Sequence, residues 1–223
     1  NLVWKGFTLD NWKNPCGAPE VCEALGNSIK IGLLATIFST ILGTMIAFAI
    51  GRYAFKGRSS SNLLIFLPMA TPEIVLGASL LSLFLVFQIN PGFWPTVIAH
   101  VMFCISFVVV TVKARIASLD PRLEQAAMDL YANELETFRR VTLPLVAPGI
   151  AGAALLAFSL SFDDFIITNF NSGTLKTFPE FVYTSAARGI PAQANVIGSA
   201  MFFLALIIVI AGQFVGKKVK VPQ

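Results

Sequence analysis

Three carboxylates lie inside segments that are otherwise strongly apolar. Glu73 belongs to LPMATPEIVLG, while Asp163 and Asp164 are adjacent in FSLSFDDFIITNF. An ionised Asp near the centre of a membrane helix is unfavourable by roughly 2.5–3.5 kcal/mol on insertion scales, so each group needs a compensating environment. Every Lys and Arg near these segments lies at a segment end. We therefore expect a cation to be the partner of these carboxylates.

Helical geometry ranks the two aspartates. If the segment is one helix, Ser161, Asp164, Thr168 and Asn171 share one stripe, whereas Asp163 is rotated from it by about 100°. Asp164, with Thr168 on the same face, is therefore the better candidate for a cation pathway. The alternative is that the carboxylates only hold helices together through hydroxyls, amides or free backbone donors.

Glu73 follows two prolines, Pro68 and Pro72, that are one helical turn apart. Proline removes a backbone donor, so the helix should kink or open near the middle of the membrane, and broken helices commonly mark transport sites. Phe162 could offer a π face to an ammonium group. Because the chain has 20 Phe, most of these rings are expected in packing and lipid contacts.

The elements that position these groups are membrane helices. The chain is 56% hydrophobic and 13% charged, and its apolar runs approach the roughly 20 residues that a spanning helix needs. Nothing alternates with the two-residue period of a barrel strand, so we predict an all-α polytopic bundle in a single domain, residues 1–223. The five visible spans are residues 28–50, 62–88, 95–112, 145–171 and 195–215.

Charge distribution predicts the orientation of the bundle. Eleven of the 16 Lys and Arg fall on one set of connections, which the positive-inside rule makes cytoplasmic. The C-terminus is then inside and residues 1–27 are outside. An odd number of spans puts the N-terminus outside, and the sequence begins at Asn1 with neither Met nor a signal-like apolar stretch. We therefore expect a sixth span before Asn1, and a genuine five-helix protein is the alternative. Cys16 and Cys22 lie in the outer segment, where a disulfide is one of two open outcomes, and Cys104 is expected to pack.

A charged amphipathic loop, residues 120–144, separates the third and fourth visible spans on the cytoplasmic side. Asp120 and Pro121 are typical of a helix start, and a second short helix is predicted from about Asn133. Pro144 marks the return into the bilayer. The loop reads as a docking surface, with a plain solvated helix as the alternative.

This loop resembles the EAA loop of bacterial ABC importer permeases, which reads Glu-Ala-Ala, three residues, Gly, nine residues, then an aliphatic residue, any residue and Leu-Pro. Gln125 stands at the Glu position and Tyr131 at the Gly position, where backbone conformation or close approach would suit glycine. The resemblance implies a coupling helix that inserts into a cytoplasmic ATPase subunit. The implied contacts are Gln125, Ala126, Ala127, Asp129, Tyr131, Glu134, Arg139, Leu143 and Pro144.

No G-x-x-x-x-G-K-[ST] phosphate loop occurs in the sequence. We therefore expect a non-enzymatic permease subunit with no cofactor of its own, ATP and Mg being bound by the partner ATPase. The single His100 is expected to be a satisfied or pathway-lining neutral imidazole, and no metal-ligand spacing is present.

From about Trp4 to Lys218, the chain is similar to the second permease subunit of the spermidine/putrescine branch of these importers. That resemblance implies ATP-driven polyamine import by alternating access in a bacterial plasma membrane. The implied partners are a homologous permease, two ATPase subunits and an extracytoplasmic binding protein, which outer residues 172–194 would touch unless they form only a surface loop. Permeases for ferric iron, another amine, an anion or a sugar, and a secondary cation transporter, remain alternatives.

Overall fold

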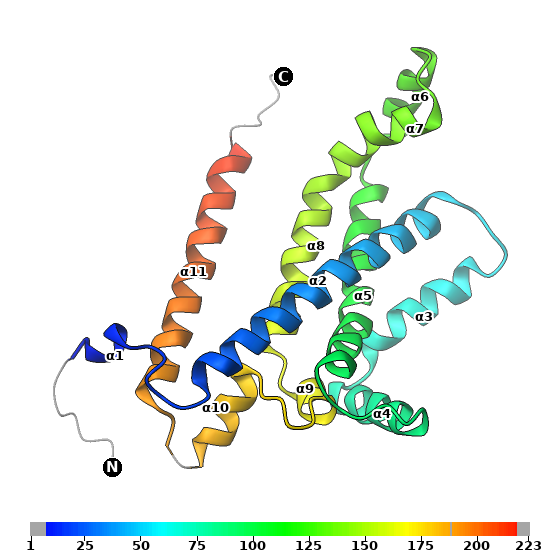
Figure 1. The fold of residues 1–223 in the computed structure, drawn as a ribbon. Coiled ribbons are helices and arrows are strands. Elements are labelled where there is room, and N and C mark those ends of the chain that lie inside the picture. The colour runs from blue at the N-terminus through cyan, green and yellow to red at the C-terminus, as the bar shows by residue number, and fades with distance from the viewer. Residues whose placement is uncertain (1–7, 188, 218–223) are drawn as a thin grey trace.

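The structure, a computed structural model, describes residues 8–187 and 189–217, and every regular element among them is a helix (Figure 1). Three helices are long and apolar enough to cross a membrane: α2 (Val21–Arg52), α5 (Phe93–Ala117) and the continuous run Glu134–Asp163. The bent pair α3 (Arg58–Ala70) and α4 (Glu73–Val86) passes the same test only together. Helix α11 (Ala192–Lys217) covers the fifth expected span. The prediction of an all-α membrane bundle is confirmed.

Small residues let the central helices approach closely. Helix α2 packs on α5 and α8 (Leu143–Asp163) with a buried face that includes Ala35, Ser39, Gly43 and Ala47. A Cβ at Gly43 would lie 2.7 Å from the side chain of Val108, so only glycine fits there. Small residues at this spacing are the usual contact surface between membrane helices.

Helices α3 and α4 meet at a bend of 106°. Pro72 directly precedes α4 and has no N–H to donate, while Thr71 takes an extended backbone (ψ 133°), which is the region favoured before proline. The kink that Pro68 and Pro72 predict is therefore confirmed. The segment expected to form one span, residues 62–88, is thus a pair of helices that run in different directions.

The expected span over residues 145–171 is also divided. Helix α8 ends at Asp163, Asp164 is extended (ψ 128°), and a short helix α9 (Ile166–Asn171) follows. The prediction of one continuous stripe was wrong in its geometry because the chain leaves the helical path at Asp164. The residues assigned to that stripe are nevertheless all buried: Ser161, Asp164, Thr168 and Asn171.

At one end of the bundle lie α1 (Asp10–Lys13), α10 (Phe178–Ala186) and the start of α2 (Figure 1). Cys16 and Cys22 form a disulfide with a Cα–Cα distance of 5.3 Å, which resolves the two open outcomes in favour of a bridge. Lys176 binds Glu20 at 2.7 Å and thereby ties the segment before α10 to α2. Cys104 is free and buried, as expected.

The opposite end of the bundle carries α6 (Arg122–Asp129), α7 (Glu134–Thr137) and a π-helix, η1 (Phe138–Thr142), which leads into α8 (Figure 1). The Asp120 carboxylate accepts the N–H of Arg122, and Asn133 forms a capping box with Glu136. Both predicted helix starts in residues 120–144 are confirmed. Lys218 and Lys220 of the expected cytoplasmic tail lie outside the described residues.

Candidate functional site

The break between α8 and α9 separates the two adjacent aspartates. Asp163, the last residue of α8, is exposed, whereas Asp164 is buried with 8% of its surface accessible. The carboxylate of Asp164 accepts the backbone N–H of Thr168 at 2.9 Å and of Ile167 at 3.3 Å. Asp164 therefore caps α9, and its charge is stabilised by the backbone donors at that helix start.

His100 of α5 holds both sides of this break. Its Nδ1 lies 2.7 Å from Ser161 Oγ on α8, and its Nε2 lies 2.9 Å from Thr168 Oγ1 on α9 and 3.4 Å from the Asp164 carboxylate. The imidazole is 1% exposed, so all of its polar atoms are satisfied inside the protein. His100 is thus the satisfied histidine that was one of the two expectations, and it positions Asp164 and Thr168.

This network includes two of the predicted pathway residues, Asp164 and Thr168. Thr168 is fully buried and its hydroxyl is occupied by His100 and Asp164. The expectation that Asp164 is the better pathway candidate rested on an unbroken helix. In this structure the Asp164 carboxylate accepts hydrogen bonds from Ile167 and Thr168, and its role in the pathway stays a prediction. Asp163 is the aspartate that the fold leaves exposed.

Glu73 comes to the same region from the other broken segment. It is the first residue of α4, it is exposed, and it lies within electrostatic range of Asp163 and Asp164. Helix α4 packs on α9 at Gly77, where a Cβ would meet the ring of Phe170 at 3.0 Å and the Cα of Ile167 at 3.3 Å. Glycine at this position therefore allows the two helix breaks to lie together.

Aromatic rings accompany the break. Phe162, half-buried, stacks on Phe158 with ring centroids 5.8 Å apart, and Phe165 packs against Tyr183 of α10 at 4.4 Å. Phe162 is thus next to the exposed Asp163 in sequence and one face of it is already covered by Phe158. No group of three or more His, Cys, Asp or Glu in the described part of the chain could hold a metal ion.

The loop between α6 and α7 forms the second part of the site. Its tip is strongly exposed: Leu130 has 81% and Tyr131 has 97% of its surface accessible. Tyr131 has a φ of +66°, which is the left-handed conformation that glycine adopts without strain. The expectation that this position suits glycine for its backbone is confirmed, although here a tyrosine occupies it.

The other predicted docking residues frame this tip. Gln125, Ala126 and Asp129 are exposed on α6, with Ala127 half-buried beneath them. Glu134, Arg139 and Pro144 are exposed and Leu143 is half-buried. Leu143 and Pro144 begin α8, whereas the other seven lie in α6, α7, η1 and the turn between α6 and α7, and no described residue covers the tip of that turn.

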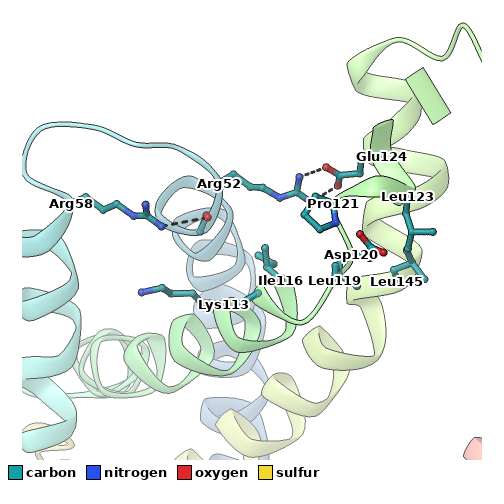
Figure 2. Close-up of a pocket in the computed structure, with 12 residues that line it drawn as sticks. Arg52, Arg58, Lys113, Ile116, Leu119, Asp120, Pro121, Leu123, Glu124 and Leu145 are labelled. Carbon is teal, nitrogen blue, oxygen red and sulfur yellow. Dashed lines mark hydrogen bonds and ion pairs between the residues drawn. The ribbon is translucent and has the colours of Figure 1, made fainter. Parts of the chain in front are cut away.

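An ion pair that the sequence did not suggest anchors α6 to the bundle. Both carboxylate oxygens of Glu124 accept hydrogen bonds from the guanidinium of Arg52 at the end of α2 (Figure 2). One of these oxygens also accepts the hydroxyl of Thr142 in η1. The hydrogen bonds from Arg52 hold the pKa of Glu124 below its usual value. The available signal was a glutamate immediately before Gln125, but its partner is 72 residues away. We call Arg52, Glu124 and Thr142 the clamp.

Comparison with known proteins agrees with this architecture. Residues 31–220 match the family described as "Binding-protein-dependent transport system inner membrane component". The chain is 34% identical over 218 residues to the spermidine/putrescine transport system permease protein PotC of Haemophilus influenzae, covering 97% of this chain and 85% of that protein. It is also 34% identical over 206 residues to the putrescine transport system permease protein PotI of Escherichia coli, covering 88% and 73%.

Solved structures share the fold. A bacterial ABC transporter involved in the import of alginate superposes with a TM-score of 0.73 at 16% identity, covering 97% of this chain and 86% of that one. An inward-facing MetNI methionine ABC transporter gives 0.72 at 14% identity, covering 90% and 96%. The chain therefore belongs to the family of inner-membrane components of binding-protein-dependent transport systems.

Proposed function

We propose that this multi-pass membrane protein is a permease subunit of an ATP-driven importer for polyamines. The observation that carries the proposal is the pair of exposed carboxylates, Glu73 and Asp163, at the breaks of two neighbouring membrane segments. Neither forms an ion pair with any residue that the structure describes. A polyamine carries ammonium groups along a chain, so two separated carboxylates suit it better than one.

The named relatives support the same substrate class, since they are permeases of spermidine/putrescine and putrescine transport systems. In the proposed complex, this chain forms the pathway with a homologous permease. The exposed tip at Leu130 and Tyr131 enters an ATPase subunit on the cytoplasmic side. ATP and Mg belong to that subunit, and this chain is non-catalytic. The C-terminus is cytoplasmic, and residues 172–194 face the binding protein.

Alternating access then links the two ends of the bundle. Movement of the ATPase subunits moves α6, and the clamp passes that movement to α2 and to the start of α8. Helix α8 carries Asp163 at its far end, so its displacement changes the access to this carboxylate. Exposed carboxylates with few fixed partners hold a cation weakly, which suits a substrate that must also leave.

The test is uptake of labelled spermidine and putrescine by the complete transporter in vesicles. Glu73→Gln and Asp163→Asn should each lower uptake about tenfold or more, because each variant removes a charge-assisted contact to an ammonium group. Asp10→Asn is the control, since Asp10 is an exposed carboxylate on α1, far from α4 (Figure 1). Unchanged uptake in both pathway variants would remove the proposed role.

The same vesicles separate the alternatives. Polyamine uptake that continues without ATP would indicate a secondary transporter. Stimulation of ATP hydrolysis by ferric iron, a sugar or an anion, with no response to either polyamine, would assign another substrate to the permease.

A further inference from the structure

A basic cavity lies beside the clamp, where α2 ends, α3 begins and α5 approaches its end (Figure 2). Its volume is about 350 Å³. Arg52, Arg58 and Lys113 line it from three different helices. Figure 2 shows Arg58 and Lys113 at one side of the cavity and Asp120 at the other.

Two of these three cations have no anionic partner among the described residues. Arg52 is committed to Glu124, but the guanidinium of Arg58 makes only a 3.5 Å contact with the carbonyl oxygen of Gly51. The ammonium of Lys113 donates to the amide oxygen of Asn62 at 2.5 Å. Among the residues that the structure describes, neither Arg58 nor Lys113 forms an ion pair.

The carboxylates of the cavity are already used. Glu124 binds Arg52 and Thr142, and Asp120 caps α6 through the N–H of Arg122. Arg58 and Lys113 are both half-buried, and a partly buried charge without a counter-charge is unfavourable. The cavity is therefore complementary to an anion near Arg58 and Lys113.

The remaining wall indicates the kind of anion. Ile116, Leu119, Leu123 and Leu145 also line the cavity, so a basic corner adjoins an apolar surface. The cavity lies at the ends of membrane helices, on the side that carries most of the Lys and Arg. Basic pockets between membrane helices at the cytoplasmic surface bind anionic lipid headgroups.

We propose that this cavity binds the phosphate of an anionic phospholipid from the cytoplasmic leaflet, with Arg58 and Lys113 as the phosphate ligands. The acyl chains lie against the apolar wall. The proposal uses the cytoplasmic orientation given above but not the polyamine substrate. Arg52 lines the cavity and also belongs to the clamp. The lipid therefore lies next to the ion pair that anchors α6.

The experiment is native mass spectrometry of the intact transporter complex titrated with phosphatidylglycerol or phosphatidylcholine. We expect preferential retention of phosphatidylglycerol. Arg58→Gln combined with Lys113→Gln should weaken it about thirtyfold, since each cation near the surface contributes about fivefold. Lys56→Gln is the control, because Lys56 is exposed, lies two residues from Arg58 and does not line the cavity.

Additional arms keep the result interpretable. Arg58→Lys retains the charge and should retain the lipid, which tests the proposal even if the double variant assembles poorly. Displacement of phosphatidylglycerol by millimolar inorganic phosphate would mean a free-phosphate site and would overturn the lipid assignment. Equal retention of both lipids, or an equal loss in Lys56→Gln, would also overturn it. Because the readout is bound lipid, it is independent of whether the complex transports polyamines.

Discussion

Tyr131→Gly tests a strongly exposed position with a left-handed backbone in the loop between α6 and α7. Tyr131 has a φ of +66° and 97% of its surface is accessible, so replacing its side chain removes no contact within the chain. A non-glycine residue in the left-handed conformation costs roughly 1–2 kcal/mol. Glycine at this position removes that cost. It also makes the unfolded chain more flexible, which offsets about 0.5–1 kcal/mol of the stabilisation.

The net gain is therefore about 0.5–1 kcal/mol for the folded turn, from the difference between these two contributions. It acts on local opening of the loop rather than on the whole bundle, since α6 and α7 contain few buried residues. The turn is closed by two backbone bonds, from Tyr131 N–H to the Met128 carbonyl and from Ala132 N–H to the Ala127 carbonyl. Amide exchange at Tyr131 and Ala132 should slow about two- to fivefold.

Hydrogen exchange followed by mass spectrometry on the assembled complex and on the isolated subunit is the assay. Tyr131→Ala keeps the left-handed strain and removes the ring, so it should not slow exchange. Gln88→Gly relieves a similar strain (φ +57°) outside the loop and should leave loop exchange unchanged. Slower exchange in Tyr131→Ala, or faster exchange in Tyr131→Gly, would refute the argument from backbone conformation.

Three further outcomes follow from the clamp and the buried histidine. Glu124→Gln should weaken the anchor of α6 by about 1 kcal/mol and reduce ATPase stimulation by substrate, whereas Asp129→Asn on the same helix should leave the anchor of α6 intact; an equal weakening of the anchor in both variants would contradict the clamp. The pKa of Glu124 is lowered in the folded state below the ordinary value of 4.5, so the clamp is complete above that value and is lost as the pH falls through the folded pKa. After correction for the intrinsic pH dependence of amide exchange, the protection factors of the α6 amides should therefore fall in acid in the native protein but stay constant in Glu124→Gln. His100→Ala should lower the free energy of unfolding by about 3–5 kcal/mol, because it leaves a cavity and buried hydroxyls without partners. His100→Asn should recover part of that loss, and an unchanged free energy of unfolding in His100→Ala would contradict the network.

Much of the fold follows from local signals. The apolar runs identify the spans, Pro72 identifies the bend, and Asp120 and Asn133 identify two helix starts. These features depend on interactions between residues close in sequence, so the sequence contains enough to predict them. The break at Asp164 was missed because no proline or glycine marks it. The helix breaks there because the Asp164 carboxylate accepts the N–H groups of the next helix. That arrangement depends on the three-dimensional environment of Asp164.

The candidate site shows the same division. The glycine-like backbone at Tyr131 could be predicted because the loop between α6 and α7 resembles the EAA loop, in which a glycine holds this position. The roles of Asp163 and Asp164 could not, because a single helical path was assumed and His100 is 64 positions away from Asp164 in the numbering. Arg52 and Glu124 meet only because α2 and α6 end at the same side of the bundle. Such long-range pairs have no signature in one sequence.

The π-helix at Phe138–Thr142 makes the rotation of α8 about its own axis depend on the number of residues between α7 and α8. A π turn holds one residue more than an α-helical turn can place, so the faces of α8 are shifted by one residue step, about 100°, relative to α7. The π-helix thus fixes the direction in which Asp163 projects from α8 relative to the loop between α6 and α7. Removing a single residue from 138–142 would rotate Asp163 about the axis of α8. The same deletion in the irregular connection at 53–57 would be absorbed within a few residues.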